Sequence, residues 1–103
     1  MAILEDVLEA AQKRLLFLPH AIRQMSRPER MITPTEVETV VSQGELLEDY
    51  PQDPRGHSCL LLGFGDADRP LHIVCSPKDD YLAIITAYLP DPAQWSEDFK
   101  RRR

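Results

Sequence analysis

The sequence predicts an α+β fold in which N-terminal helices pack on a three- to four-stranded antiparallel sheet and a C-terminal helix follows. Two observations carry this prediction. Apolar residues recur at helical spacing before Gly44, and short apolar runs separated by Gly- and Asp-rich turns occupy the stretch from Leu46 to Tyr88. Helices followed by consecutive hairpin strands are typical of α+β proteins with an antiparallel sheet.

Two helices are predicted at the N-terminus. Apolar residues on one side and charged residues on the other indicate an amphipathic helix over Ile3–Leu16. Pro19 suits the first position of a second, short helix over His20–Ser26, because a proline there lacks only an N–H that would stay unbonded. Pro28 then ends that helix.

A third helix is indicated by a strong start signal. Thr33 is placed as the N-cap, Pro34 as the first helical residue and Glu36 as the acid of a capping box. Valines at helical spacing supply its buried face, and Gly44 is a natural end.

The second half of the sequence predicts the strands. An edge strand and three core strands are expected, in chain order at Leu46–Tyr50, Ser58–Phe64, Leu71–Ser76 and Tyr81–Tyr88. Pro90, Asp91 and Pro92 then open the predicted last helix, with Trp95 and Phe99 one turn apart on its apolar side.

Length and composition limit the type of protein. The 103 residues are enough for one domain, 1–103, and 43% hydrophobic content supports a core. Two acids stand near the N-terminus, where a signal peptide is basic, and no apolar run is long enough to cross a bilayer, so we expect a cytoplasmic protein without membrane contact.

Cys59 and Cys75 are expected to be buried reduced thiols. Self-association would add stability to so small a domain, so a homo-oligomer is one expected state.

The formal net charge of −5 argues against a general nucleic-acid binder, because phosphate contacts need a basic surface. The basic residues are nevertheless concentrated. One stretch carries His20, Arg23, Arg27 and Arg30, and the chain finishes in the basic run Lys100–Arg103. A local basic site on an acidic body is therefore compatible with the composition.

No metal site and no other cofactor are expected. The three histidines, His20, His57 and His72, lack the spacing of metal ligands, and neither a Gly-rich phosphate loop nor a nucleophile elbow is present.

Strand alternation selects one group of residues that could carry chemistry. His72, Thr86 and Tyr88 are expected on one sheet face, with His72 across from Thr86 or Ile84. The residues expected to face the core are Leu71, Ile73, Cys75, Ala83, Ile85 and Ala87. An imidazole, a hydroxyl and a phenol together form a candidate acid–base group. The alternative is that they are half-exposed strand residues with ordinary hydrogen bonds.

A candidate anion-binding residue stands next to this group. Arg69 precedes a strand, where a guanidinium can grip a phosphate or carboxylate with two hydrogen bonds; the alternative is a solvated arginine.

Several segments resemble a widespread family of small, largely uncharacterised prokaryotic proteins that is catalogued as a domain of unknown function. The resemblance covers roughly residues 20–101. Its segments are His20-Ala21 with Met25, Arg30-Met31-Ile32, Glu48–Pro51, Leu62-Gly63, Arg69–Val74, Ile85–Tyr88 and Pro90-Asp91 with Trp95.

That family is similar in turn to the BrnT, MqsR and RelE toxins, small ribonucleases that cut messenger RNA. The resemblance implies a RelE-like fold and metal-independent RNA cleavage, in which the ribose 2′-hydroxyl attacks the adjacent phosphate. That reaction needs a base, an acid and cationic groups, and His72, Tyr88 and an arginine are the right residue types. The candidate catalytic residues are therefore His72, Tyr88 and Thr86, the candidate substrate-binding residues are Arg69, His20 and Arg30, and an antitoxin protein is one expected partner. The alternative is a non-catalytic protein-binding module of the same fold, which the acidic net charge favours.

Overall fold

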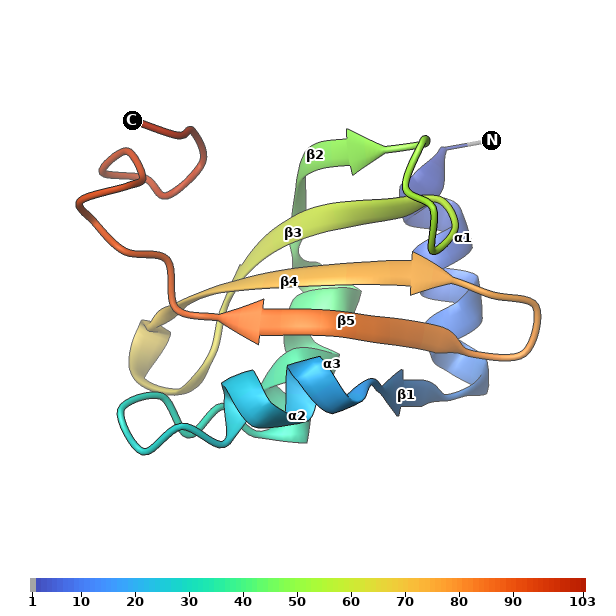
Figure 1. Ribbon diagram of the computed structural model, residues 1–103, viewed down its shortest axis with the longest axis horizontal. Helices are drawn as coiled ribbons and strands as arrows, with labels where there is room; N and C mark the ends of the chain where they lie inside the picture. Colours follow the sequence, from blue (N-terminus) through green and yellow to red (C-terminus); the bar gives the residue numbers. More distant parts are fainter. Residues whose placement is uncertain (1) are drawn as a thin grey trace.

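A computed structural model describes residues 2–103 and shows a five-stranded mixed sheet with helices packed on it (Figure 1). The elements are α1 Ile3–Lys13, β1 Leu15–Phe17, α2 Pro19–Met25, α3 Pro34–Gln43, β2 Glu45–Tyr50, β3 Ser58–Phe64, a 3₁₀ turn Asp66–Asp68, β4 Pro70–Pro77 and β5 Leu82–Tyr88. The strand order is β1-β5-β4-β3-β2. The α+β class is confirmed, and the four predicted strands pair antiparallel as β2, β3, β4 and β5. The predicted strand count is wrong, because β1 adds a fifth strand that runs parallel to β5.

The short strand β1 replaces the predicted last turn of the first helix. α1 ends at Lys13, and Arg14 is fully extended. The Arg14 carbonyl accepts a hydrogen bond from Leu82 N–H at 2.8 Å, and Leu18 N–H donates to the Ile84 carbonyl at 3.0 Å. These bonds pair the chain with the edge of β5, so a tertiary partner overrides the local helical spacing.

The starts of α2 and α3 agree with the sequence prediction. Pro19 occupies the first turn of α2, and Pro34 that of α3. Thr33 Oγ1 accepts from Glu36 N–H at 3.1 Å, and Thr33 N–H donates to Glu36 Oε1 at 3.0 Å, which completes the predicted capping box. The helix ends at Gly44, also as predicted.

The predicted C-terminal helix is wrong. After β5 the chain forms a series of turns, in which Trp95 and Arg102 pair as an isolated bridge and Phe99 has a φ of 63°. Asp91 accepts from Ala93 N–H through its side chain, and Asp98 accepts from Lys100 N–H in the same way. Such local side-chain bonds compete with helical ones, so proline and acid signals that resemble a helix start here produce turns.

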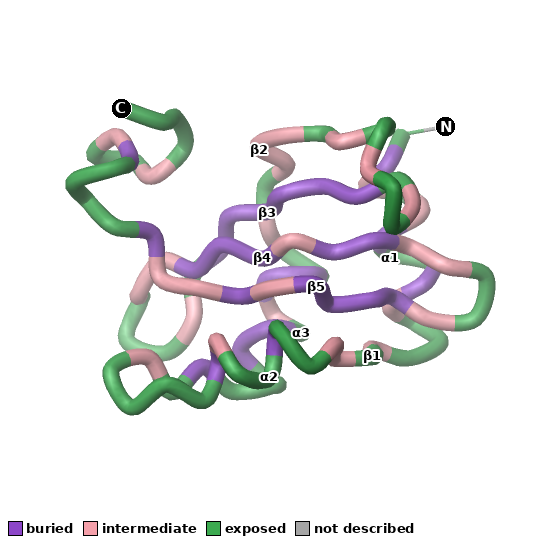
Figure 2. Tube along the Cα trace, viewed as in Figure 1, coloured by how far each residue is buried: buried purple, intermediate pink, exposed green. Residues whose placement is uncertain are grey.

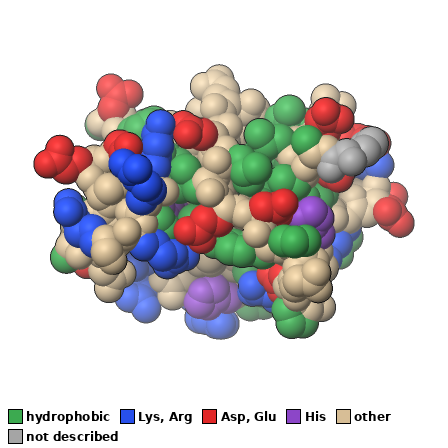
Figure 3. Space-filling view, turned by 90° about the horizontal axis from the view of Figure 1, so that it is seen from above, with side chains coloured by type: hydrophobic (Ala, Val, Ile, Leu, Met, Phe, Trp, Pro, Cys, Tyr) green, Lys and Arg blue, Asp and Glu red, His purple; other side chains and the backbone are tan. Residues whose placement is uncertain are grey.

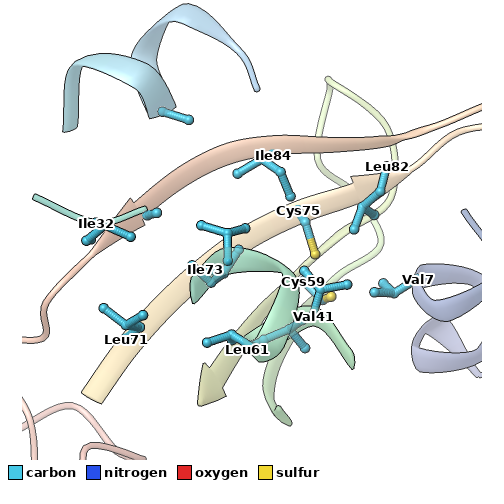
Figure 4. Close-up of a cluster of buried hydrophobic side chains, with 14 of the residues drawn as sticks. Val7, Ile32, Val41, Cys59, Leu61, Leu71, Ile73, Cys75, Leu82 and Ile84 are labelled. Carbon is cyan, nitrogen blue, oxygen red and sulfur yellow. The ribbon is translucent and has the colours of Figure 1, made fainter. Parts of the chain in front are cut away.

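The main core lies between the helices and one face of the sheet. Figure 4 shows Val7 of α1 and Val41 of α3 in one cluster with Leu61, Ile73 and Ile84 of the strands, and all five are buried. Figure 2 shows that β3, β4 and β5 are buried along most of their length.

The two cysteines belong to this core. Cys59 and Cys75 are register partners on β3 and β4, and both are buried free thiols.

A β-bulge divides β5 into two parts with opposite side-chain parity. The pairing with β4 shifts between Val74↔Thr86 and Cys75↔Ile84, which leaves Ile85 as the extra residue. Leu82, Ile84 and Ala87 therefore belong to the helix-side core, whereas Ala83 and Ile85 are buried outside it. The prediction that Ala83 and Ile85 face that core is wrong, because strict alternation does not survive a bulge.

A buried ion pair joins α3 to the turn between β3 and β4. The Glu36 side chain is 2% exposed, and both of its oxygens accept from Arg69, at 2.7 and 3.0 Å. Asp66 N–H donates to the same carboxylate at 2.8 Å, and Arg69 also donates to the carbonyls of Arg30 and Met31. The hydrogen bonds from Arg69 lower the pKa of Glu36 from 4.5 to about 2, against the opposing effect of burial.

We expect Glu36→Gln to destabilise the protein by about 3 kcal/mol at pH 7, which corresponds to the pKa shift and leaves Arg69 without its counter-ion. The folded pKa lies below the unfolded one, so this stability is present above pH 4.5 and is lost as the pH falls toward 2. Urea unfolding at several pH values measures it.

Glu38→Gln is the control, because Glu38 is exposed on the same helix and its loss should change stability by less than about 0.5 kcal/mol. Equal effects of the two substitutions at pH 7 would show that the buried pair is not a major stabilising contact.

Candidate functional site

An open hollow of about 360 Å³ lies beside α2, where β5 meets the C-terminal segment, which we define as residues 90–103. Its lining residues are His20, Gln24, Arg30, Thr86, Tyr88, Gln94, Trp95 and Arg102. Four of the six predicted site residues, His20, Arg30, Thr86 and Tyr88, thus come together here from α2, the following loop and β5. None of the residues that line this hollow is acidic, although the whole chain carries 17 acids.

His72 lies directly beneath the hollow. It is the register partner of Tyr88, and its Nδ1 is 3.1 Å from the Tyr88 hydroxyl. Its Nε2 is 2.8 Å from the carbonyl oxygen of Phe99, and the Trp95 ring stands edge-on at 4.4 Å between centroids. The prediction that His72 shares a face with Tyr88 is confirmed, but His72 sits opposite Tyr88 instead of Thr86 or Ile84. The expected partial exposure holds for Tyr88 and is wrong for His72, which is 0% exposed.

The surroundings of His72 determine where its proton lies. A carbonyl oxygen only accepts, so Nε2 carries the hydrogen that is donated to Phe99. Burial lowers the pKa of His72, and in the neutral ring Nδ1 must then accept from the Tyr88 hydroxyl. Burial also raises the pKa of Tyr88, so the phenol stays neutral. The hydroxyl of Tyr88 thus points its hydrogen at His72 and leaves its oxygen lone pairs for a ligand in the hollow.

Arg69 does not line the hollow. Its guanidinium is occupied by Glu36 and by the carbonyls of Arg30 and Met31, as described above. It acts on the hollow indirectly, because it holds the backbone of Arg30, whose own guanidinium donates to the Gln24 side chain.

The far wall of the hollow comes from the C-terminal segment. The Arg102 guanidinium lies over the Trp95 ring, 4.7 Å from its centroid, and donates to both oxygens of Glu48 at 3.0 and 3.2 Å. These bonds lower the pKa of Glu48, which also accepts from the Tyr50 hydroxyl. Burial and the nearby Glu48 carboxylate raise the pKa of Tyr50 to about 12. Figure 3 shows several Lys and Arg side chains at the end of the molecule that carries this segment.

A model of the family described as a domain of unknown function, DUF4258, matches residues 17–89. The chain belongs to this family. No curated protein and no solved structure matches it. The DUF4258 match includes His20, Arg30, His72 and Tyr88, and it stops at Leu89, just before the C-terminal segment.

The hollow therefore combines a part inside the DUF4258 match with a part outside it. Sequence reasoning missed Glu48 and Arg102 as site residues, and it placed Trp95 on a helix. Glu48 belongs to one of the segments that resemble the family, and Arg102 belongs to the basic run Lys100–Arg103. Nothing in the sequence indicates that these two positions meet in the fold. Only the turn structure after β5 does so.

Two further observations concern metal binding and membrane-spanning helices. Across residues 2–103, no three His, Cys, Asp or Glu side chains lie close enough together to hold a metal ion. Within the same residues, none of the helices has the length and apolar character that a bilayer crossing requires.

We expect the His72 imidazole to be neutral at pH 7, with its hydrogen on Nε2 and a pKa below 6.5, because burial disfavours the charged form. Nitrogen-15 NMR of the ring measures both the tautomer and the titration. A hydrogen on Nδ1, or a charged ring at pH 7, would contradict the proposed direction of the Tyr88 hydrogen bond.

The lowered pKa of His72 also makes the stability of the folded protein depend on pH. The unfolded chain binds the His72 proton more readily, so the free energy of unfolding should fall as the pH drops below 6.5 toward the folded pKa. His72→Gln should lack this part of the pH dependence.

Proposed function

We propose that this protein is a metal-independent, toxin-like endoribonuclease that cleaves RNA in the hollow. The observation that carries the proposal is the Tyr88 hydroxyl, which faces the hollow while donating to the buried neutral His72. The resemblance to the BrnT, MqsR and RelE toxins supports the same reaction class and a RelE-like relation of the folds.

In this proposal Tyr88 and His72 act together as the general base. As the ribose 2′-oxygen attacks phosphorus, its proton passes to the Tyr88 oxygen, and the Tyr88 proton passes to Nδ1 of His72. His72 becomes an imidazolium whose Nε2–H is already bonded to the Phe99 carbonyl. Tyr88 ends the step as a neutral phenol, so its raised pKa is no obstacle.

The other walls of the hollow serve the phosphate and the leaving group. His20 is exposed on α2 and lines the hollow, where it acts as the general acid that donates a proton to the departing 5′-oxygen as the P–O5′ bond breaks. Arg30 also lines the hollow and holds the charged phosphorane, and Thr86 supplies a hydroxyl on the same strand as Tyr88. The products are a 2′,3′-cyclic phosphate and a 5′-hydroxyl.

A second candidate function is a protein-binding module of the same fold. The net charge of −5 favours it, because a protein partner, unlike a nucleic acid, does not need a basic surface. An antitoxin protein or a second copy of this chain would then bind without any reaction taking place in the hollow.

We expect Tyr88→Phe to reduce RNA cleavage by about 10²-fold or more, because it removes the group that takes the proton, while the ring still fills its place. Tyr81→Phe is the matched control, since Tyr81 lies just before the start of β5 with Arg14 over its ring, far along the strand from Tyr88, and its substitution should leave cleavage unchanged. Cleavage of a labelled single-stranded RNA, with identification of the cyclic phosphate end, measures both.

The reaction should survive a metal chelator and should not occur on DNA, which lacks the 2′-hydroxyl. The rate should also rise with pH through a value below 6.5, as His72 loses its proton. Cleavage of DNA or a strict need for a metal ion would contradict the mechanism, and an intact RNA would favour the protein-binding module.

A further inference from the structure

The C-terminal segment contributes a second cation to the hollow. Arg102 is 62% exposed and lines the hollow together with residues supplied by α2. A guanidinium has five N–H donors, and Glu48 takes two of them, at Nε and Nη2. The Tyr50 hydroxyl also contacts the guanidinium. The donors that neither Glu48 nor Tyr50 uses are left for a ligand.

The position of this arginine is held from two sides. Glu48 on β2 fixes the guanidinium with a two-point contact, and the Trp95 ring supports it from below at 4.7 Å. Trp95 in turn packs edge-on against His72. The contacts therefore run without interruption from Glu48 to the imidazole beneath Tyr88.

We propose that Arg102 binds the scissile phosphate of a single-stranded RNA together with Arg30, and that Glu48 is its positioning residue. This inference rests on the proposed function and deepens it, because it places part of the site outside the DUF4258 match. A planar guanidinium held by a carboxylate and an aromatic ring is ready for two-point contact with a phosphate. A single strand suits the open hollow, since its phosphates and bases are accessible.

The binding test uses the full chain and a fluorescently labelled, uncleavable 2′-O-methyl RNA oligomer, whose anisotropy gives the affinity. Arg102→Gln should weaken binding at least tenfold and reduce the slope of log K against log salt by about one, as expected for one lost phosphate contact. Arg103→Gln removes the same charge from the neighbouring residue, whose guanidinium bonds to the Pro92 carbonyl, and should change affinity less than twofold. Trp95 is the single tryptophan, so its emission should change when RNA binds to the unsubstituted protein.

Glu48→Gln tests positioning. It removes the fixed contact but leaves Arg102 its charge, so kcat should fall about tenfold while KM stays the same or falls. If Glu48 only stabilised the fold, its substitution would instead lower the melting temperature and raise KM.

Equal affinities of the Arg102→Gln and Arg103→Gln variants would overturn the inference, as would an unchanged kcat in Glu48→Gln. The outcome also separates the two proposals. Arg102-dependent binding without cleavage of ordinary RNA would refute the proposed reaction and retain the phosphate site. Cleavage that does not depend on Arg102 would refute the phosphate site alone.

Discussion

The ion pair between Glu36 and Arg69 is the contact on which the arrangement of this protein depends. It joins the start of α3, the turn between β3 and β4 and the loop after α2, three pieces that no strand pairing connects. The approach is so close that a Cβ on Gly65 would stand 2.2 Å from a Glu36 oxygen, so a larger residue there would displace the buried carboxylate from its hydrogen bonds. Because Arg69 also binds the Arg30 carbonyl, the pair sets the position of one wall of the hollow.

The bulge in β5 is the second constraint. It lets Leu82 and Ile84 fill the core at one end of the strand, while Ala87 fills it at the other end. As a result, Tyr88 stands next to His72 on the opposite face with the hydroxyl and the imidazole in contact. Bulges often re-aim side chains beside functional sites, and this one separates a packing half of the strand from a half that carries polar groups.

The charge distribution makes an acidic protein compatible with the proposed anionic ligand. The net charge of −5 sets the long-range field, but contact with a phosphate depends on groups within one Debye length, about 8–10 Å in physiological salt. Arg30 and Arg102 meet at the hollow, and Glu48 neutralises the second only in part while fixing its direction. We expect such a site to bind RNA in a specific place and to show little affinity for nucleic acid elsewhere.

The sequence by itself determined the α+β class, the starts of α2 and α3, the three core strands and the shared face of His72 and Tyr88, because these follow from capping residues and side-chain periodicity within short segments. It did not reveal β1, the bulge at Ile85 or the turns that replace the last helix, because each is decided by a partner distant in the chain or by local bonds that resemble a helix start. Arg69 shows the difference most clearly. Its residue type suited a phosphate, but only the folded chain brings Glu36 and the carbonyls of Arg30 and Met31 to it, and these acceptors occupy the guanidinium. Arg102 is the converse case, an unremarkable residue of a basic run that the tertiary structure brings to the site through Glu48 and Trp95.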